Sequence, residues 1–318
     1  NLSDIRGLAL DPRTGHLYFF SMREKRLYEV TQSGETASVR EFLDFELHNP
    51  LAMLFAPSGD RTDDPAQMSL YVVEGGLDDG APSNLSDAAA GRGQIVELTF
   101  TEEVLPLDSH LVATLVQVVD MSQFSPPSPD PSGLAYLPQY GRLLASDGEV
   151  NEMPQYFTGD NLFDISLSGN LVDTLTSLSF SDEPVGADVN PANGHLFISD
   201  DTGSRGVYEV DPGPDGLYDT PDDTVSFFST GAFDGRDPEG LAYAPEGLGT
   251  LYILDGVNRE VYRLTPGPNG EFDGVPPDGD DGLSQFDTLS FGLDDPEGIA
   301  LNPVNGHLYA VGKPADTL

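Results

Sequence analysis

The hexapeptide Asp237-Pro238-Glu239-Gly240-Leu241-Ala242 returns 58 residues later as Asp295-Pro296-Glu297-Gly298-Ile299-Ala300, and this repeat decides the fold. Looser copies of the hexapeptide begin at Asp4, Asn49, Asp130 and Glu183. Most copies are followed by a Pro/Gly turn and then by an apolar pair, as in Gly194-His195-Leu196-Phe197. Self-similarity at a fixed spacing indicates a chain built from related structural units, and here there are six.

The clear copies are spaced by 53 to 58 residues, which suits a blade of four antiparallel strands. Within a unit, an Asn-Gly hairpin such as Asn193-Gly194 precedes the second strand, and Val207-Tyr208-Glu209-Val210 alternates as a half-buried strand does. No segment keeps a helical period over three turns. We therefore predict an all-β fold, a six-bladed β-propeller of four-stranded antiparallel blades. It forms a single domain over 1–318, with approximate blades at 3–44, 45–125, 126–180, 181–236, 237–293 and 294–318.

The last unit stops after its second predicted strand, whereas the first residues already begin an innermost strand. Neither end supplies the missing outer strands, so the last blade is predicted to be incomplete. Because an open sheet leaves unpaired edges, we expect this chain to be a piece of a longer polypeptide.

The chain is strongly acidic, with 54 Asp and Glu against 14 Lys and Arg and a formal net charge of −40. This charge repels phosphate backbones and anionic lipids, so we expect no nucleic-acid partner, and no apolar stretch is long enough for membrane insertion. Cysteine is absent, which excludes disulfides. An acidic surface suits either a calcium-rich extracellular setting or a saline cytoplasm. The acidic loops favour the first, an extracellular or cell-surface location.

Two units carry matching acidic insertions between their third and fourth predicted strands, at 211–223 and 266–281. Asp or Asn alternates there with Gly, and a hard cation needs such a set of oxygens on a backbone that turns tightly. Calcium is the predicted cofactor of these rim loops, although Asp/Gly/Pro turns that merely close a hairpin are also common. The predicted metal ligands are Asp211, Asp215, Asp219, Asp222, Asp223, Asn269, Asp273, Asp278, Asp280 and Asp281.

A second acidic group is predicted at one mouth of the central channel, where the turn into each innermost strand lies near the turn after each second strand. The first set of turns offers Asp237, Glu239, Asp295 and Glu297, with Asp130 and Glu183 in weaker copies. The second set offers Glu74, Asp147, Asp200, Asp201, Asp255 and Asn258. Asp-Pro-x-Gly is also simply a good turn sequence, which leaves a purely structural role open.

The repeat resembles NHL-type and gluconolactonase-like six-bladed propellers, in a secreted bacterial variety with calcium loops. The resemblance is clearest in Pro238-x-Gly240-Leu241-Ala242, in Gly249-Thr250-Leu251-Tyr252-Ile253-Leu254-Asp255 and in Asn258-Arg259-Glu260-Val261-Tyr262. In gluconolactonase-like proteins, turn residues of this kind hold a catalytic divalent metal. The resemblance thus implies Glu239 and Glu297 as central ligands, helped by Asp200 or Asp255. Arg6, Ser132 and Val185 replace the Glu in other copies, so the family's ligand set is incomplete.

The first functional hypothesis is a calcium-stabilised extracellular propeller that serves as a binding or structural module, without catalytic residues. Its partners would be other domains of the same longer chain, surface proteins or glycans. The alternative is a metal-dependent hydrolase of lactonase or esterase type with a central divalent cation. A calcium-independent scaffold of a halophile would explain the charge but not the matching loops.

Overall fold

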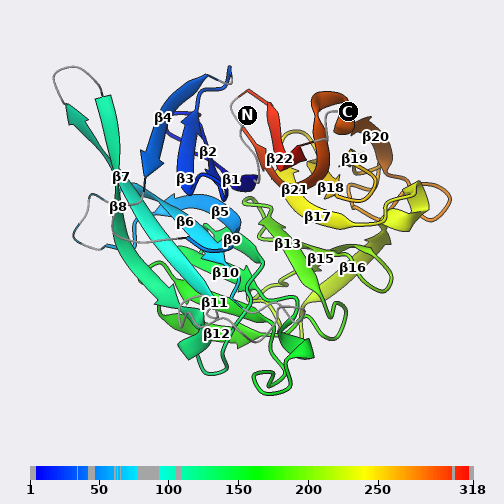
Figure 1. Ribbon diagram of the computed structural model, residues 1–318. Helices are drawn as coiled ribbons and strands as arrows, with labels where there is room; N and C mark the ends of the chain where they lie inside the picture. The colour runs from blue at the N-terminus through cyan, green and yellow to red at the C-terminus, as the bar shows by residue number, and fades with distance from the viewer. Residues whose placement is uncertain are drawn as a thin grey trace.

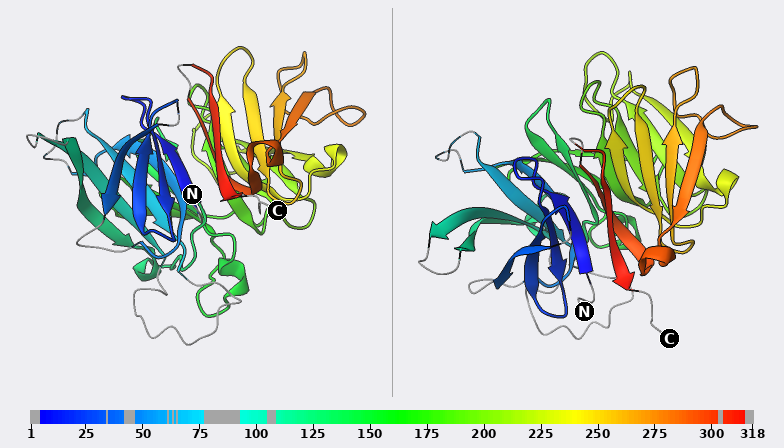
Figure 2. Two further views of the ribbon diagram at one scale, coloured as in Figure 1. Left: turned by 45° about the horizontal axis from the view of Figure 1, so that its top comes forward. Right: turned by 90° about the horizontal axis from the view of Figure 1, so that it is seen from above.

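Six antiparallel sheets surround one central axis (Figure 1; Figure 2). The computed structural model describes residues 5–33, 35–41, 47–60, 62, 64, 66–76, 93–104, 109–302 and 305–314. The first sheet comprises β1 (Ile5–Leu10), β2 (Leu17–Ser21), β3 (Arg26–Val30) and β4 (Thr36–Glu41). The second comprises β5 (Pro50–Pro57), β6 (Met68–Glu74), β7 (Gln94–Val104) and β8 (Ser109–Asp120). The third comprises β9 (Gly133–Leu137), β10 (Arg142–Ser146), β11 (Leu162–Ser166) and β12 (Leu171–Leu175).

The fourth sheet comprises β13 (Pro184–Val189), β14 (Leu196–Asp200), β15 (Gly206–Asp211) and β16 (Thr224–Ser229). The fifth comprises β17 (Pro238–Ala244), β18 (Thr250–Asp255), β19 (Glu260–Thr265) and β20 (Gly282–Asp287). The sixth has only β21 (Leu293–Leu301) and β22 (Leu308–Pro314) among the described residues. The helices described are four single turns, η1 (Met121–Gln123), η2 (Val150–Glu152), η3 (Thr230–Phe233) and η4 (Leu289–Phe291). None of them has the length and apolar character that a membrane span requires.

The predicted fold class is therefore confirmed, with five complete blades and a two-stranded sixth. Strands follow one another in sequence order across each complete blade, and all pairs are antiparallel. Each innermost strand contacts the innermost strand of the next blade, and β21 contacts β1. The inner ring thus closes although the sixth blade lacks outer strands in the described part of the chain.

The glycine of the hexapeptide determines how closely neighbouring blades approach. A Cβ at Gly186 would lie 2.5 Å from the carbonyl oxygen of Glu239, and one at Gly240 would lie 2.9 Å from that of Glu297. The pairing of β13 with β14, and of β17 with β18, shifts register at these residues, as a β-bulge does. The repeat needs glycine because the main chains of adjacent innermost strands touch there.

Aromatic side chains fill the space between the blades. Tyr18 on β2 packs edge-on against Phe55 of the next blade, with ring centroids 5.1 Å apart. Phe197 on β14 stacks on Tyr243 of the following blade at 5.3 Å. Both second-strand aromatics are almost fully buried, so the sheets are held together by apolar packing between their faces.

Candidate functional site

The innermost strands enclose a cavity of about 320 Å³ on the propeller axis. Five of the six strands each contribute three consecutive residues that end the hexapeptide turn or begin the strand, and β1 contributes the first and third of the equivalent triplet, Arg6 and Leu8. The first residues of the six triplets are Arg6, Leu51, Ser132, Val185, Glu239 and Glu297. The second are glycine or alanine, and the third are apolar or small, as in Leu134 and Leu241. The cavity therefore has a chemically mixed first layer and an apolar third layer.

The acidic residues of the first layer are confined to two neighbouring blades. Glu239 belongs to β17 and Glu297 to β21, whereas the adjoining blade on the other side of β21 supplies Arg6. Arg6 donates a hydrogen bond from Nη1 to Glu297 Oε2 at 3.0 Å, which forms an ion pair. The negative charge that lines the channel is thus concentrated on one side of it, beside β17.

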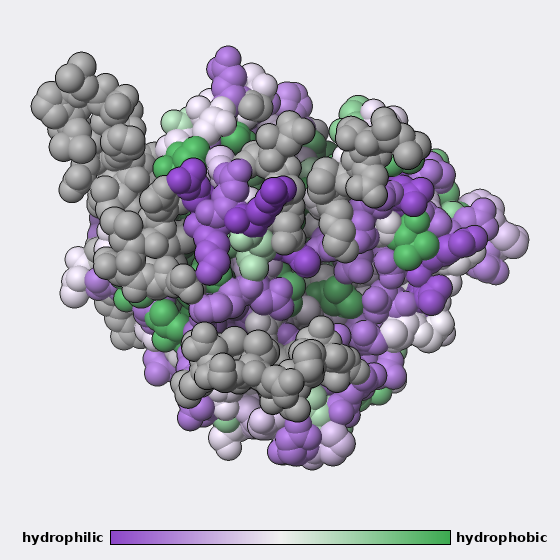
Figure 3. Space-filling view, in the orientation of Figure 1, coloured by the Kyte–Doolittle hydropathy of each residue, from purple (hydrophilic) through white to green (hydrophobic). Residues whose placement is uncertain are grey.

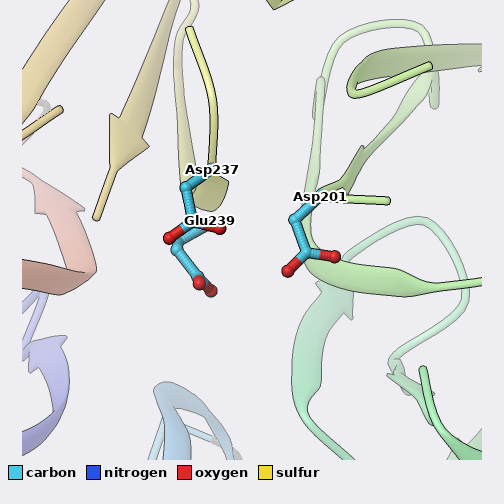
Figure 4. A group of neighbouring side chains, drawn as sticks. All are labelled: Asp201, Asp237 and Glu239. Atoms are coloured by element: carbon cyan, nitrogen blue, oxygen red, sulfur yellow. The ribbon is translucent and has the colours of Figure 1, made fainter. Parts of the chain in front are cut away.

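Three carboxylates converge at this side of the channel. Asp201, Asp237 and Glu239 each offer an oxygen, and these oxygens lie within 4.8 Å of one another (Figure 4). Asp237 and Glu239 flank the start of β17, while Asp201 follows β14 of the preceding blade and faces them. All three are half-buried, and Asp201 Oδ1 is a buried atom with no hydrogen-bond partner among the described residues.

The pKa values of these three carboxyl groups are raised by burial and by the closeness of their negative charges. Burial raises the pKa of Glu239 to about 8, and the charges of Asp237 and Asp201 add to this effect, followed by those of Glu297 and Asp295. Burial and neighbouring carboxylates also raise the pKa of Asp201 and of Asp237. A divalent cation among the three carboxylates would relieve this repulsion. On the face drawn in Figure 3, hydrophilic and apolar residues lie side by side around the centre.

Glu183 extends the acidic group along the mouth. Burial raises its pKa to about 7, with the charge of Asp201 as the next contribution, while a hydrogen bond with Thr202 acts in the opposite direction. A carboxyl group with a pKa near neutrality can accept or release a proton at physiological pH.

Four of the predicted channel residues accept hydrogen bonds that hold neighbouring turns together. Asp147 Oδ2 accepts the Asp130 N–H at 3.0 Å, and Asp255 Oδ2 accepts the Arg236 N–H at 2.6 Å. Glu74 Oε1 accepts the Asn49 N–H at 3.2 Å in the same way. Asp200 accepts from the Ser181 hydroxyl at 2.6 Å and from the Thr202 N–H at 3.0 Å. All four are buried, and none is among the described residues that line the cavity.

The structure therefore brings Asp237 and Glu239 together with Asp201, whereas the resemblance implies Asp200 or Asp255 as the additional ligand. Asp200 is the last residue of β14 and accepts hydrogen bonds from Ser181 and Thr202, whereas Asp201 lies beyond the strand and faces Asp237 and Glu239. Asp295 and Glu297 lie close enough to add to the charge felt by Glu239.

The two rim loops differ in how their acids are arranged. In the loop at 266–281, Asp273, Asp280 and Asp281 offer oxygens within 4.8 Å of one another, and the Asn269 amide donates to Asp273 at 2.8 Å. Asp278 lies outside this group.

Within the described residues, the loop at 211–223 forms no comparable group. There Asp211, Asp215 and Asp219 accept the N–H groups of Gly213, Leu217 and Thr176 at 2.8–3.1 Å. Asp222 and Asp223 accept from the Thr220 hydroxyl at 2.8 and 2.9 Å.

Comparison with models of known protein families and with curated proteins found no match. Solved structures do match. A luciferin-regenerating enzyme superposes with a TM-score of 0.58 at 13% identity, covering 98% of this chain and 84% of the other. A protein described as a candidate gluconolactonase gives 0.56 at 14% identity, covering 99% and 87%. An auxiliary nutrient-binding protein from Bacteroides ovatus gives 0.56 at 12% identity, covering 97% and 67%.

These structural neighbours are six-bladed propellers and include both enzymes and a binding protein, and the carboxylate clusters described above are arranged so that they could bind a metal. At such low identity the likeness concerns the fold alone. The resemblance predicted from the repeat is confirmed at that level: the chain has the fold of the six-bladed propellers of the gluconolactonase kind.

Proposed function

We propose that this protein is an extracellular binding module that holds a small ligand in its central channel through a calcium ion bound by Asp201, Asp237 and Glu239. The observation that carries the proposal is the convergence of three carboxylate oxygens within 4.8 Å beside a cavity of about 320 Å³. Such a volume is at the lower end of the range that small-molecule sites occupy.

The chemistry of the donor set supports calcium. All three side chains offer oxygen only, and oxygen ligands suit hard cations such as calcium, magnesium and manganese. The cluster lies at a channel mouth built from turns of two blades, where carbonyl oxygens and water can complete the variable coordination that calcium tolerates better than magnesium. A bound cation would also neutralise part of the net charge of −40.

The wall of the channel indicates the class of ligand. The cation and Arg6 would attract an oxygen-rich or anionic group, while Leu51, Leu134 and Leu241 offer an apolar surface to a carbon skeleton. We therefore propose a small organic molecule with a carboxylate, ester or lactone group at one end.

The second candidate is a metal-dependent hydrolase of lactonase or esterase type. One observation favours it: Glu183, whose pKa is raised to about 7, interacts electrostatically with Asp201. A bound cation supplies Lewis acidity for a carbonyl group or for water, and Glu183 would act as the proton acceptor. The luciferin-regenerating enzyme and the nutrient-binding protein share this fold, which is compatible with either activity.

The location and the partners are part of the same proposal. The acidic composition and the absence of cysteine support a calcium-rich extracellular or cell-surface setting, in which metal rather than disulfides reinforces the fold. Other domains of a longer chain, surface proteins or glycans are the proposed partners. Repulsion of other polyanions by the surface supports the exclusion of nucleic acid.

Calorimetric titration of calcium into the intact protein tests the cation site. Because burial raises the pKa of Glu239 to about 8, calcium binding at pH 7 should release a proton, and affinity should weaken as pH falls from 8 to 6. The variant Asp201→Asn/Glu239→Gln should lose this proton-linked binding. Asp215→Asn, a change in a rim loop, is the matched control and should bind as the wild type does.

Unchanged calcium binding in Asp201→Asn/Glu239→Gln would refute the cation site. Hydrolysis is tested separately with an aryl ester and an aldonolactone in the presence of calcium. Turnover that disappears in Glu183→Gln while calcium binding persists would establish the hydrolase, and no turnover together with ligand binding would support the binding module.

A further inference from the structure

A second acidic cluster lies far from the propeller axis, in the loop that joins the third and fourth strands of the fifth blade. Asp273, Asp280 and Asp281 come from the two sides of this loop between β19 and β20, and their carboxylate oxygens lie within 4.8 Å of one another. The central channel is lined by first strands, so the two clusters occupy different parts of the blades.

Asp281 is the least accessible member and carries an unsatisfied oxygen. Its relative exposure is 4%, and Oδ2 accepts the Gly274 N–H at 2.9 Å. The other oxygen, Oδ1, is a buried atom with no hydrogen-bond partner among the described residues. A buried carboxylate oxygen without a donor costs free energy, and either a proton or a cation would remove that cost.

Two glycines let the other carboxylates lie directly on the backbone of the loop. A Cβ at Gly267 would lie 1.9 Å from Asp280 Oδ1, and one at Gly279 would lie 2.1 Å from Asp273 Oδ1. Any larger residue at these positions would displace an acid of the cluster. The carboxylates of Asp280 and Asp273 therefore occupy the space that a side chain at Gly267 or Gly279 would need.

The cluster is built on a fixed support. Phe272 and Val275, on the same loop, are buried in the core of the fifth blade, and Phe272 packs edge-on against Phe197 at 5.6 Å. The acids are therefore held near one another by apolar packing, in a position where their charges repel. In the absence of a cation, burial raises the pKa of Asp281 to about 6, and the charges of Asp273 and Asp280 contribute.

We infer that this loop binds a structural calcium ion through Asp273, Asp280 and Asp281, at a site independent of the channel. The donors are oxygens on a tight, glycine-containing turn, which is the environment that calcium prefers. Bound calcium supplies the partner that Asp281 Oδ1 lacks and screens the three charges from one another. Its role is to fix the outer hairpin of the fifth blade.

The experiment uses the full chain in the Asp201→Asn/Glu239→Gln background, so that failure of the channel site and failure of the rim site can be told apart. Calcium titration followed by calorimetry should still find one equivalent bound. At a calcium concentration about 100-fold above the dissociation constant, the melting temperature should rise by about 5 °C. Adding Asp273→Asn/Asp280→Asn should abolish both effects, and Asp281→Asn should weaken binding at least tenfold.

The matched control is Asp215→Asn/Asp222→Asn in the loop at 211–223, which should leave the calcium response intact. Equal responses in the two pairs of variants, or an unchanged response in Asp273→Asn/Asp280→Asn, would overturn the inference. Hydrogen exchange on the unmutated protein guards against variants that do not fold. Calcium should slow exchange of the amides at 266–281 relative to those at 211–223, and equal exchange with and without calcium would also overturn it.

Discussion

The loops at 211–223 and 266–281 occupy the same position in adjacent blades and share an Asp/Gly/Pro composition with one buried aromatic, yet their carboxylates are arranged differently. In the first loop, the acids accept hydrogen bonds from backbone N–H groups and from the Thr220 hydroxyl. In the second, Gly267 and Gly279 leave room for Asp280 and Asp273, and these two acids and Asp281 offer oxygens within 4.8 Å of one another. The comparison indicates that the hydrogen-bond donors around the acids, rather than the number of acids, decide whether their oxygens come close enough for a candidate cation site.

Removing the aromatic anchor of each loop should have the largest effect. Phe272→Ala deletes a buried ring from the core, so unfolding should become easier by about 3–5 kcal/mol, with a melting temperature about 6–10 °C lower. Tyr218→Ala, which also removes a hydrogen bond to the Gly194 carbonyl, should cost a similar amount. Only Phe272→Ala should also reduce the calcium response, measured by melting with and without calcium. A parallel loss in Tyr218→Ala would erase the distinction between the loops.

Two glycine-to-alanine variants in the second loop should show whether calcium binding is lost through a steric clash or through an unfavourable backbone conformation. Gly279→Ala puts a Cβ 2.1 Å from Asp273 Oδ1 and 2.3 Å from the Gly274 carbonyl oxygen, so calcium binding should be lost and stability should fall by about 1–3 kcal/mol. Gly270→Ala meets open space but has a φ of +79°, so it should cost about 1 kcal/mol and keep the calcium site. Calorimetry and chemical denaturation report the two quantities. Retained binding in Gly279→Ala would mean that the acids do not need their present positions.

The contributions of Asp281 in the second loop and of Asp222 in the first loop to the pH dependence of stability should have opposite signs in the absence of calcium. The folded-state pKa of Asp281 is raised to about 6, so the native state holds a proton that the unfolded chain releases near pH 4. Stability therefore falls as pH rises from about 4 to 6, and Asp281→Asn should remove this fall.

In the first loop, the Thr220 hydroxyl lowers the pKa of Asp222. Its contribution to stability is present above the ordinary pKa of an aspartate and is lost as pH falls below it. Thr220→Val should raise the pKa of Asp222, and carboxyl NMR titration measures both groups. Titration of Asp281 at an ordinary aspartate pKa would contradict the buried geometry.

The smallest effect is expected from Asp215→Asn. Asp215 is exposed and accepts one local N–H at 2.8 Å, a bond that the amide oxygen of asparagine can replace. Stability should change by less than about 0.5 kcal/mol, with no change in calcium binding. A calcium response that disappears in this variant would place a cation in the first loop as well.

The repeat alone was sufficient to predict the propeller, because Asp-Pro-x-Gly, the Asn-Gly hairpin and the alternating strand recur at blade spacing. The site was harder to predict. Asp200 and Asp201 are adjacent in the sequence, and only the end of β14 determines that the first is bound by Ser181 while the second reaches Glu239. Likewise, both rim loops read as cation sites, because the sequence does not reveal which acids already have donors such as Thr220.

The glycines between adjacent innermost strands have a consequence for how this scaffold could diversify. Because main-chain carbonyl oxygens lie against Gly133, Gly186 and Gly240, the spacing of the neighbouring innermost strands at these three residues is set by the main chain and not by side chains. Chemical variety can enter in the residues immediately before and after each of these glycines, such as Glu239 and Leu241 around Gly240. A new ligand preference would thus arise by exchanging these side chains while the spacing of the main chains at the glycines stays the same.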